Sequence, residues 1–146
     1  MKETITADLG AAYTTSSMAF DIIRGGHLDL TFLGGLQVSA TGDISNWIIP
    51  GKMVRGMGGA MDLVASGSKV VVVMEHTAKG EQKLLEKNTL PHTADGVVSM
   101  VITEKAVFAK ENGRLVLTEV AKESSLEEVK ALTGFKFEHK DNLKTF

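Results

Sequence analysis

The run Lys-Val-Val-Val-Val-Met at residues 69–74 is the feature that most limits what this 146-residue chain can fold into. Its valines do not alternate with polar residues, so both faces of the segment are apolar. A strand of this kind suits the centre of a sheet that is covered on both faces, as parallel sheets are. The run therefore predicts an α/β protein built around a central strand.

One helix is predicted near the amino terminus. Ser16 or Ser17 can cap its start, because a serine hydroxyl accepts a hydrogen bond from a main-chain N–H of the first turn. Arg24 stands in its last turn, and Gly25-Gly26 follows as a stop signal. A second, shorter helix is predicted at residues 60–65.

Two further segments before the valine run carry strand signals. Residues 27–34 alternate between apolar and polar side chains, which predicts a strand with an apolar face. A short strand is also predicted at residues 4–6. The apolar side chains on the shared face of the longer strand are Leu28, Leu30 and Phe32.

A β-hairpin is predicted in the carboxy-terminal half. Residues 97–110 and 114–120 are rich in β-branched and apolar side chains. They flank Glu111-Asn112-Gly113, and Asn-Gly is a strong signal for a tight hairpin turn.

The last predicted elements are a helix and a strand. Ser125 and Glu128 form the pattern of a capping box for a helix at 126–132, and Gly134 is expected to end it. Residues 135–139 are predicted to form one more short strand. Together these elements predict an α/β fold, with a mixed, largely parallel sheet and flanking helices, in one domain over residues 1–146 or part of one.

Composition excludes several classes of function. The net charge of −2 gives no basic surface for nucleic acid or an anionic membrane. The absence of cysteine excludes disulfides, thiolate metal sites and a cysteine nucleophile. No stretch approaches the ~18 apolar residues of a membrane span, and the first ten residues lack a signal-peptide pattern. The sequence therefore favours a protein that handles small molecules or other proteins.

Residues 50–63, PGKMVRGMGGAMDL, carry four glycines and three methionines. This glycine-rich segment matches neither phosphate-binding motif, because Met53 follows Gly51-Lys52 and Met61 occupies the small position of a dinucleotide fingerprint. So much glycine excludes a continuous helix, so Met53, Met57 and Met61 are expected to line an apolar groove. Exposed main-chain N–H groups in an apolar setting can bind an anion or an oxyanion.

Other polar residues give weaker signals. The histidines never fall at metal-ligand spacing, and no metal site is predicted. His76 follows Glu75 at the end of the valine strand, where α/β sites tend to lie, but a structural role is favoured over catalysis. Trp47 is expected to anchor its loop by packing. The remaining histidines are His27, His92 and His139, and the carboxylates expected to act as caps or ion-pair partners are Asp29, Asp62 and Glu104.

Three long motifs resemble the succinyl-CoA:3-ketoacid CoA transferase family, in its B subunit or carboxy-terminal half. They are RGGHLDLTFLGGLQV, GDISNWIIPGKMVRGMGGAMDLV and KVVVVMEH. TLPHT and ITEKAVF extend the resemblance over nearly the whole chain. TEKAVF and MEHTAKG resemble mitochondrial members more than bacterial ones, so the expected compartment is the mitochondrial matrix or the bacterial cytoplasm.

The resemblance implies a ping-pong transfer of CoA from succinyl-CoA to a 3-oxo acid such as acetoacetate. A glutamate attacks the thioester and becomes a glutamyl-CoA thioester by way of a mixed anhydride. The resemblance assigns the Gly59 N–H as an oxyanion donor, and it implies that a Cβ at this position would crowd the approaching thioester. Coenzyme A enters as a substrate, and no separate cofactor is implied. The other residues implied in the CoA and substrate groove are Gly58, Ala60, Met61, Lys2 and Gln37.

The family's nucleophile lies in a Ser-Glu-Asn-Gly motif upstream of the point that matches Met1. The only Glu-Asn-Gly in this chain starts at Glu111, in the predicted hairpin turn. We therefore expect a fold that is incomplete at the amino terminus and inactive alone. It would need an upstream segment and an A subunit or first half of the enzyme, in a homo- or hetero-oligomer.

Two alternatives stay open. The chain can be a non-catalytic CoA-binding or interaction module. It can also be an intact enzyme that uses a different acid as nucleophile, and Glu75 and Glu104 are the candidates.

Overall fold

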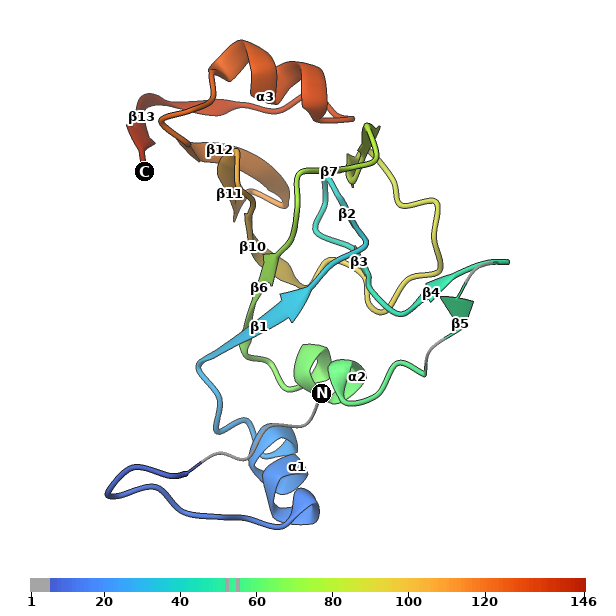
Figure 1. The fold of residues 1–146 in the computed structure, drawn as a ribbon, viewed down its shortest axis with the longest axis vertical. Coiled ribbons are helices and arrows are strands. Elements are labelled where there is room, and N and C mark those ends of the chain that lie inside the picture. Colours follow the sequence, from blue (N-terminus) through green and yellow to red (C-terminus); the bar gives the residue numbers. More distant parts are fainter. Residues whose placement is uncertain (1–5, 52, 55) are drawn as a thin grey trace.

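The computed structural model describes residues 6–51, 53–54 and 56–146 (Figure 1). None of the helices in these ranges is long and apolar enough to cross a membrane. The helices are α1 (Ser16–Arg24), α2 (Ala60–Ala65) and α3 (Leu126–Leu132). The strands are β1 (Leu30–Gly34), β2 (Gln37–Ser39), β3 (Ile44–Ser45), β4 (Ile48–Ile49), β5 (Met53–Val54), β6 (Lys69–Val73), β7 (Thr77–Ala78), β8 (Glu81–Gln82), β9 (Leu84–Leu85), β10 (Val98–Ile102), β11 (Ala106–Glu111), β12 (Arg114–Val120) and β13 (His139–Thr145).

The main sheet has the strand order β1-β6-β10-β11-β12-β13. β6 pairs in parallel with β1 and with β10, and β12 pairs in parallel with β13. The β10–β11 and β11–β12 pairs are antiparallel. This arrangement confirms a mixed, largely parallel sheet in an α/β fold, with the valine run as an inner strand.

The two faces of the valine strand differ more than predicted. Val70 and Val72 are buried in the core, as expected. On the opposite face Val71 is also buried, but Val73 is 49% exposed, and Leu30 and Phe32 of the adjacent strand β1 are 44% and 61% exposed. The prediction that both faces are covered therefore holds at Val71 and is wrong at Val73 and along β1. Alternation showed that Leu30 and Phe32 share a face, but it could not show which face meets the core.

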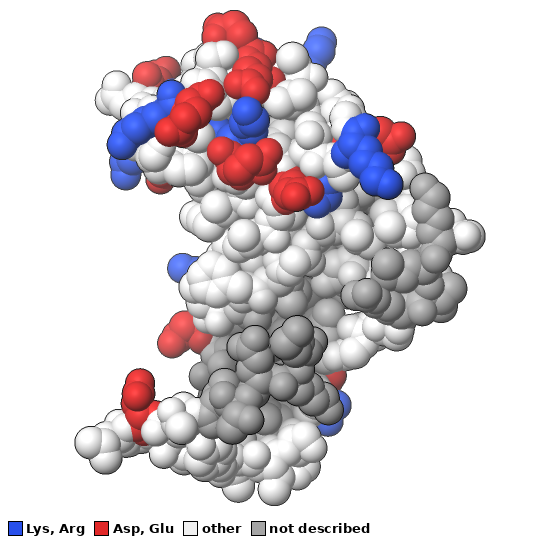
Figure 2. All heavy atoms as spheres, viewed as in Figure 1, with Lys and Arg blue, Asp and Glu red and all other residues white. Residues whose placement is uncertain are grey.

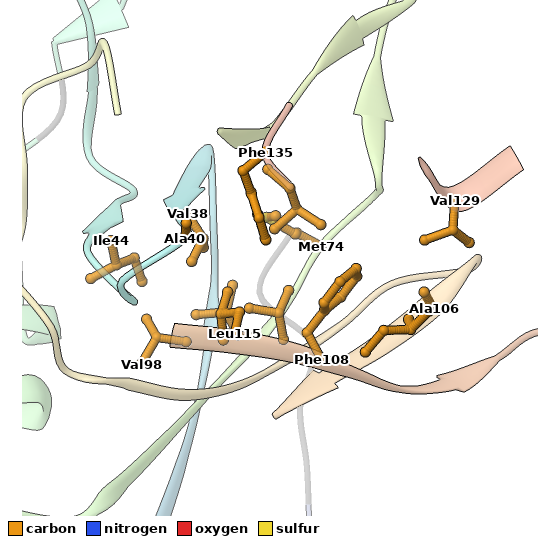
Figure 3. Close-up of a cluster of buried hydrophobic side chains, with 14 of the residues drawn as sticks. Val38, Ala40, Ile44, Met74, Val98, Ala106, Phe108, Leu115, Val129 and Phe135 are labelled. Carbon is orange, nitrogen blue, oxygen red and sulfur yellow. The ribbon is translucent and has the colours of Figure 1, made fainter. Parts of the chain in front are cut away.

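The core lies between the main sheet and a small sheet of strands β3, β2 and β9 (Figure 3). Phe108 of β11 is fully buried and contacts two further aromatic rings. The ring centroids of Phe135 and Phe137 lie 6.0 and 5.2 Å from that of Phe108, in tilted and edge-to-face geometry. Such arrangements are favourable for aromatic pairs. The segment after α3 is thus held in place by its side chains.

That packing explains a wrong prediction. Residues 135–139 do not form a strand, and β13 begins only at His139. Phe135 and Phe137 imitate an alternating strand pattern because both point into the aromatic cluster. The run at 97–110 also proves to be two strands, β10 and β11, separated by a turn at residues 103–105.

The predicted hairpin turn is confirmed between β11 and β12. Asn112 and Gly113 both have positive φ, at 48° and 83°. Two consecutive positive values are what a type I′ turn requires, and Asn-Gly adopts them readily. Glu111, the residue before the turn, accepts a hydrogen bond from Lys140 at 2.6 Å.

The start of α1 lies one residue earlier than predicted. Thr15 is the cap, and its side chain accepts from the Met18 N–H at 3.2 Å. Residues 15–17 all carry hydroxyls, so their types alone could not identify the capping residue. The end is as predicted, with Gly25 at the C-cap and Gly26 at positive φ. The predicted strand at 4–6 falls largely outside the described residues.

Helix α3 keeps one half of the predicted capping box. The Ser125 hydroxyl accepts from the Glu128 N–H at 3.1 Å, which confirms the cap. The Glu128 carboxylate does not return to Ser125, because it accepts from Lys105 at 2.7 Å and from Ser124 at 2.8 Å. The ion pair with Lys105 joins α3 to the turn between β10 and β11.

Gly134 follows α3 for a different reason from the one predicted. Its φ is not positive, and its N–H donates to the Leu84 carbonyl at 2.7 Å. A Cβ at this position would lie 2.8 Å from the Leu84 carbonyl oxygen and 2.9 Å from Leu85. Gly134 is therefore required by close packing against β9.

His76 is completely buried just beyond β6, which favours the structural role predicted for it. Its Nδ1 lies 2.9 Å from the Thr103 hydroxyl. That hydroxyl already accepts from the N–H groups of Lys105 and Ala106, so both of its lone pairs are in use and it cannot accept from the ring. Its one proton faces two acceptors, Nδ1 and the Ala106 carbonyl at 3.1 Å, so Nδ1 is an acceptor in this arrangement.

The other ring nitrogen completes a neutral tautomer. His76 Nε2 lies 3.0 Å from the Thr133 hydroxyl, which donates to the Val129 carbonyl at 2.7 Å. Since the hydroxyl has one proton and gives it to Val129, Nε2 carries the imidazole proton and donates to Thr133. The neutral ring fits both hydroxyls, whereas a second proton on Nδ1 would face a hydroxyl whose two lone pairs are already in use.

We expect this buried histidine to make the fold acid-sensitive. Burial lowers the pKa of His76 below its ordinary value of 6.5, and Lys105 acts in the same direction, against the opposing charges of Glu104 and Glu128. The unfolded chain then binds a proton more readily than the folded chain, so stability is complete above pH 6.5 and falls below it. The free energy of unfolding, measured in urea between pH 7 and 5, should fall by at most about 1.4 kcal/mol per pH unit.

The matched variants are His76→Gln and His139→Gln, because His139 is exposed. The pH slope should be lost in the first variant and kept in the second. An unchanged slope in His76→Gln would show that other groups cause the acid sensitivity.

Gly134→Ala should destabilise the fold by about 1–3 kcal/mol, because the new methyl group meets main-chain atoms of β9. Gly34→Ala is the control, since a Cβ there meets nothing within 4 Å and φ is not positive. Thermal and urea unfolding of both variants measure the difference. Equal stabilities would contradict the packing role of Gly134.

Candidate functional site

The glycine-rich segment contains two sharp changes of chain direction followed by a helix. Gly51 and Gly58 have positive φ, at 76° and 55°, which side chains with a Cβ rarely adopt. Gly59 has ordinary helical angles and is the N-cap of α2. Figure 1 shows α2 beside the amino ends of β1 and β6.

The main-chain N–H groups of Gly58 and Gly59 donate to no partner among the residues that the structure describes. They stand at the amino end of α2, where unpaired N–H groups give a partial positive charge. Met61 in the first turn is 49% exposed, and Ala60 beside it is partly exposed. The segment therefore brings four of the predicted site residues together in an apolar setting, with donors that no described residue engages.

One neighbour of Gly59 was not predicted from the sequence. A Cβ at Gly59 would lie 3.2 and 3.3 Å from two ring carbons of Phe20 on α1. A side chain at residue 59 would therefore meet Phe20 of this same chain first. The resemblance had implied instead that it would crowd the substrate.

The methionines lie in different elements. Met53 belongs to β5, Met57 to the turn before α2, and Met61 to α2. This confirms that no continuous helix carries them. The groove that they were expected to line stays a prediction.

The structure bears on one of the two remaining predicted groove residues. Lys2 lies outside the described residues, whereas Gln37 is engaged with another loop. The Gln37 side chain accepts from the N–H groups of Thr89 and Leu90, at 2.9 and 3.0 Å, and donates to the Thr89 hydroxyl at 3.0 Å. Its polar atoms hold the 89–90 loop, and contact with substrate stays a prediction.

Trp47 anchors its loop through a hydrogen bond, whereas the sequence predicted anchoring by packing. Its indole N–H donates to the His92 carbonyl at 3.3 Å, so the connection from β3 to β4 is tied to the 88–96 loop. The same loop is fixed by Thr93, whose N–H donates to the Ile44 carbonyl at 2.7 Å. These bonds lie next to the β4–β5 ribbon, whose second strand is part of the glycine-rich segment.

The 88–96 loop also gathers three groups with metal-ligating atoms, which are Asp43, His92 and Asp95. Both oxygens of Asp43 are occupied, one by the Ser39 hydroxyl at 2.7 Å and one by the Gly96 N–H at 2.8 Å. Partial burial would raise the pKa of Asp43, but these hydrogen bonds outweigh it and hold the pKa below its ordinary value. His92 is paired with Asp95. We assign the group a role in anchoring the loop.

The alternative nucleophiles lie away from the glycine-rich segment. Glu75 and Glu104 stand beyond the carboxyl ends of β6 and β10, and Glu104 accepts from the His76 N–H at 2.9 Å. The segment lies at the amino end of β6, and a five-residue strand separates its two ends by about 16 Å. Glu111 is held in the hairpin by Lys140.

The structure also shows the contacts of the other carboxylates and of His27. Asp62 pairs with Arg24, at 2.8 Å between Oδ1 and Nε, which confirms an ion-pair role. The Asp29 carbonyl accepts from the Lys69 N–H at 3.1 Å, so its main chain helps to begin the β1–β6 pairing. His27 packs its ring beside Gly25.

A family model described as coenzyme A transferase matches residues 1–132. Among curated relatives, the mitochondrial succinyl-CoA:3-ketoacid coenzyme A transferase 2A of Rattus norvegicus is 52% identical over 98% of this chain. The B subunit of a probable succinyl-CoA:3-ketoacid coenzyme A transferase of Bacillus subtilis is 54% identical over 88% of it. The beta chain of the acetate CoA-transferase of Escherichia coli is 50% identical over 93% of it.

The chain spans only part of these relatives, namely 28% of the rat protein, 60% of the B. subtilis protein and 63% of the E. coli protein. Relatives of mitochondrial and bacterial origin match with similar identity. The relatives are named for different acids, a 3-ketoacid for the rat protein and acetate for the E. coli protein.

Solved structures agree with the fold. An acyl-CoA transferase of E. coli O157:H7, in a thioester complex with CoA, superposes with a TM-score of 0.81 at 25% identity, over 99% of this chain and 33% of that chain. The decarboxylase AibA/AibB superposes with a TM-score of 0.76 at 23% identity, over 94% of this chain and 59% of that chain, which shows a shared fold alone. On the family match and the close relatives together, the chain belongs to the coenzyme A transferase family.

Proposed function

We propose that this chain is part of a CoA transferase that moves CoA from succinyl-CoA to a 3-oxo acid such as acetoacetate, in ketone-body or short-chain fatty acid metabolism. The observation that carries the proposal is the glycine-rich segment, where the N–H groups of Gly58 and Gly59 have no partner among the described residues and stand beside the exposed Met61. Relatives about half identical to the chain are named as transferases of this reaction. Coenzyme A acts as a substrate, with no separate cofactor.

In this proposal the Gly59 N–H donates to the oxyanion of each tetrahedral intermediate. A donor that is fixed before the reaction needs no reorganisation when charge develops on the thioester oxygen. The pantetheine arm runs beside Ala60 and Met61, whose apolar surfaces suit its methylene groups. The resemblance also assigns Gln37 and Lys2 to this groove, and their contact with the substrate is part of the proposal.

We infer that the glutamate nucleophile comes from a part of the enzyme outside these residues. The motif Ser-Glu-Asn-Gly does not occur in the sequence. The carboxylates considered as alternative nucleophiles have other partners or lie far from the glycine-rich segment. Glu104 accepts from the His76 N–H, and Glu111 pairs with Lys140.

The uncovered face of the sheet supports a partner. A groove of about 430 Å³ is bordered by Phe32, Val71 and Ile102, and Figure 2 shows charged side chains gathered mainly toward the α3 and β13 end. Parallel strands are normally covered on both faces, so further protein is expected there. The proposed partner is the A subunit or remaining portion of the same enzyme, in the mitochondrial matrix or the bacterial cytoplasm.

A non-catalytic CoA-binding module is the second candidate. It is favoured by the same N–H groups of Gly58 and Gly59, which would bind CoA without a nucleophile nearby. Saturable CoA binding by the chain, with no turnover after the rest of the transferase is added, would support it.

The chain alone should not form acetoacetyl-CoA from succinyl-CoA and acetoacetate, and turnover should appear when the remaining portion of the transferase is added.

In that assembled enzyme Gly59→Pro should lower kcat by about 10²–10³-fold relative to Gly59→Ala. Both variants place a Cβ against Phe20, but only proline removes the N–H. The φ of −72° at Gly59 is one that proline adopts. Equal rates for the two variants would refute the oxyanion role, and turnover by the chain alone would refute an external nucleophile.

The chain alone should self-associate through its uncovered sheet face, as dimers or larger species. Sedimentation velocity over a concentration series should show association that Phe32→Glu weakens, since a buried carboxylate would be costly there. Leu9→Glu changes an exposed apolar residue outside the sheet and should leave association unchanged. A monodisperse monomer at all concentrations would contradict the prediction.

A further inference from the structure

Helix α1 touches the glycine-rich segment at the residue that carries the proposed donor. The Phe20 ring lies directly against the main chain of Gly59, at 3.2 Å from the position that a Cβ would take. A Cβ at this position would be closer to the ring than ordinary contacts allow, so a side chain at residue 59 would displace the ring or the main chain by a few tenths of an ångström. Phe20 therefore supports the main chain of Gly59 from one side.

Arg24, one turn further along α1, joins this ring to α2. Its guanidinium lies over the Phe20 ring, 5.4 Å from the centroid, and its Nε donates to Asp62 Oδ1 at 2.8 Å. Asp62 stands in the first turn of α2, three residues after Gly59. One arginine thus holds both the ring that supports Gly59 and the helix that Gly59 begins.

The exposure of this arrangement argues against a role in folding alone. The Arg24 side chain is 63% exposed, and exposed ion pairs contribute little to stability. Residues of α1 are not buried in the core of the chain. The contacts converge on the orientation of one short helix and the N–H groups at its start.

We propose that Phe20 and Arg24 are positioning residues, which hold the Gly59 N–H in the direction that the reaction requires. The inference rests on the proposed function of Gly59 as an oxyanion donor. Such a donor acts within about 2.7–3.1 Å of the oxyanion. A displacement of about 1 Å by a remote substitution can lower the rate by up to about 10²-fold. Loosening α1 from α2 should therefore affect the chemical step more than substrate binding.

The test uses the assembled transferase with Arg24→Gln, Asp62→Asn and their double variant. Each single variant should lower kcat by about tenfold or more, with little change in the KM for succinyl-CoA. The double variant should be no slower than the slower single variant, because both remove the same contact. Arg24→Lys keeps the charge but loses the planar stacking, and should recover part of the rate.

Phe20→Leu tests the ring, and Arg114→Gln is the matched control. Arg114 forms a comparable exposed pair with Glu86, at 3.0 Å, far from the glycine-rich segment in the sequence. Phe20→Leu should lower kcat, whereas Arg114→Gln should leave it unchanged. In NMR spectra of the chain, the amide signals of Gly58 and Gly59 should shift in the Phe20 and Arg24 variants and stay in place in Arg114→Gln.

Rates and amide signals identical to wild type in Phe20→Leu and Arg24→Gln would overturn the inference. Effects of Arg24→Gln and Asp62→Asn that simply add would also overturn it. If Gly59→Pro slows the enzyme relative to Gly59→Ala while the α1 variants do not, the oxyanion role stands and the positioning role fails. If the two Gly59 variants are equally active, the proposed function of Gly59 fails first.

Discussion

Burial of the inner face of β6 is the interaction on which the rest of this structure depends. Val70 and Val72 are removed from water between the main sheet and the β3-β2-β9 sheet. Each buried valine side chain contributes about 1.5–3 kcal/mol. Because β6 pairs with β1 and β10 in parallel, the same strand fixes where α2 lies at one end and where His76 lies at the other. The site and the acid-sensitive histidine are therefore both positioned by one strand.

Local signals predicted most of the fold and only part of the site. The valine run, the Asn112-Gly113 turn and the Ser125 cap were found because each depends on neighbours in the sequence. The aromatic pair at Phe135 and Phe137 misled, since burial against Phe108 produces alternation without a strand. Local patterns describe a segment, and they do not describe what packs on it.

The contacts that complete the site lie far apart in the sequence. Arg24 and Asp62 are separated by 38 positions, and no spacing rule joins them. In the sequence Phe20 is one apolar residue of its helix, and nothing there connects it with Gly59. The resemblance identified Gly59 as a donor that a substrate approaches, but only the structure shows the residues packed around it. The fold also does not fix the reaction, because a decarboxylase shares it at 23% identity.

The position of His76 has a consequence for engineering this protein. The histidine and the glycine-rich segment stand beyond opposite ends of β6, about 16 Å apart along the strand. Substitutions that far apart, with no shared partners, generally have additive effects. Replacing the His76, Thr103 and Thr133 side chains together with apolar groups of similar volume would remove the protonation site and its polar partners at once. Tolerance to acid could thus be designed into this chain separately from its chemistry.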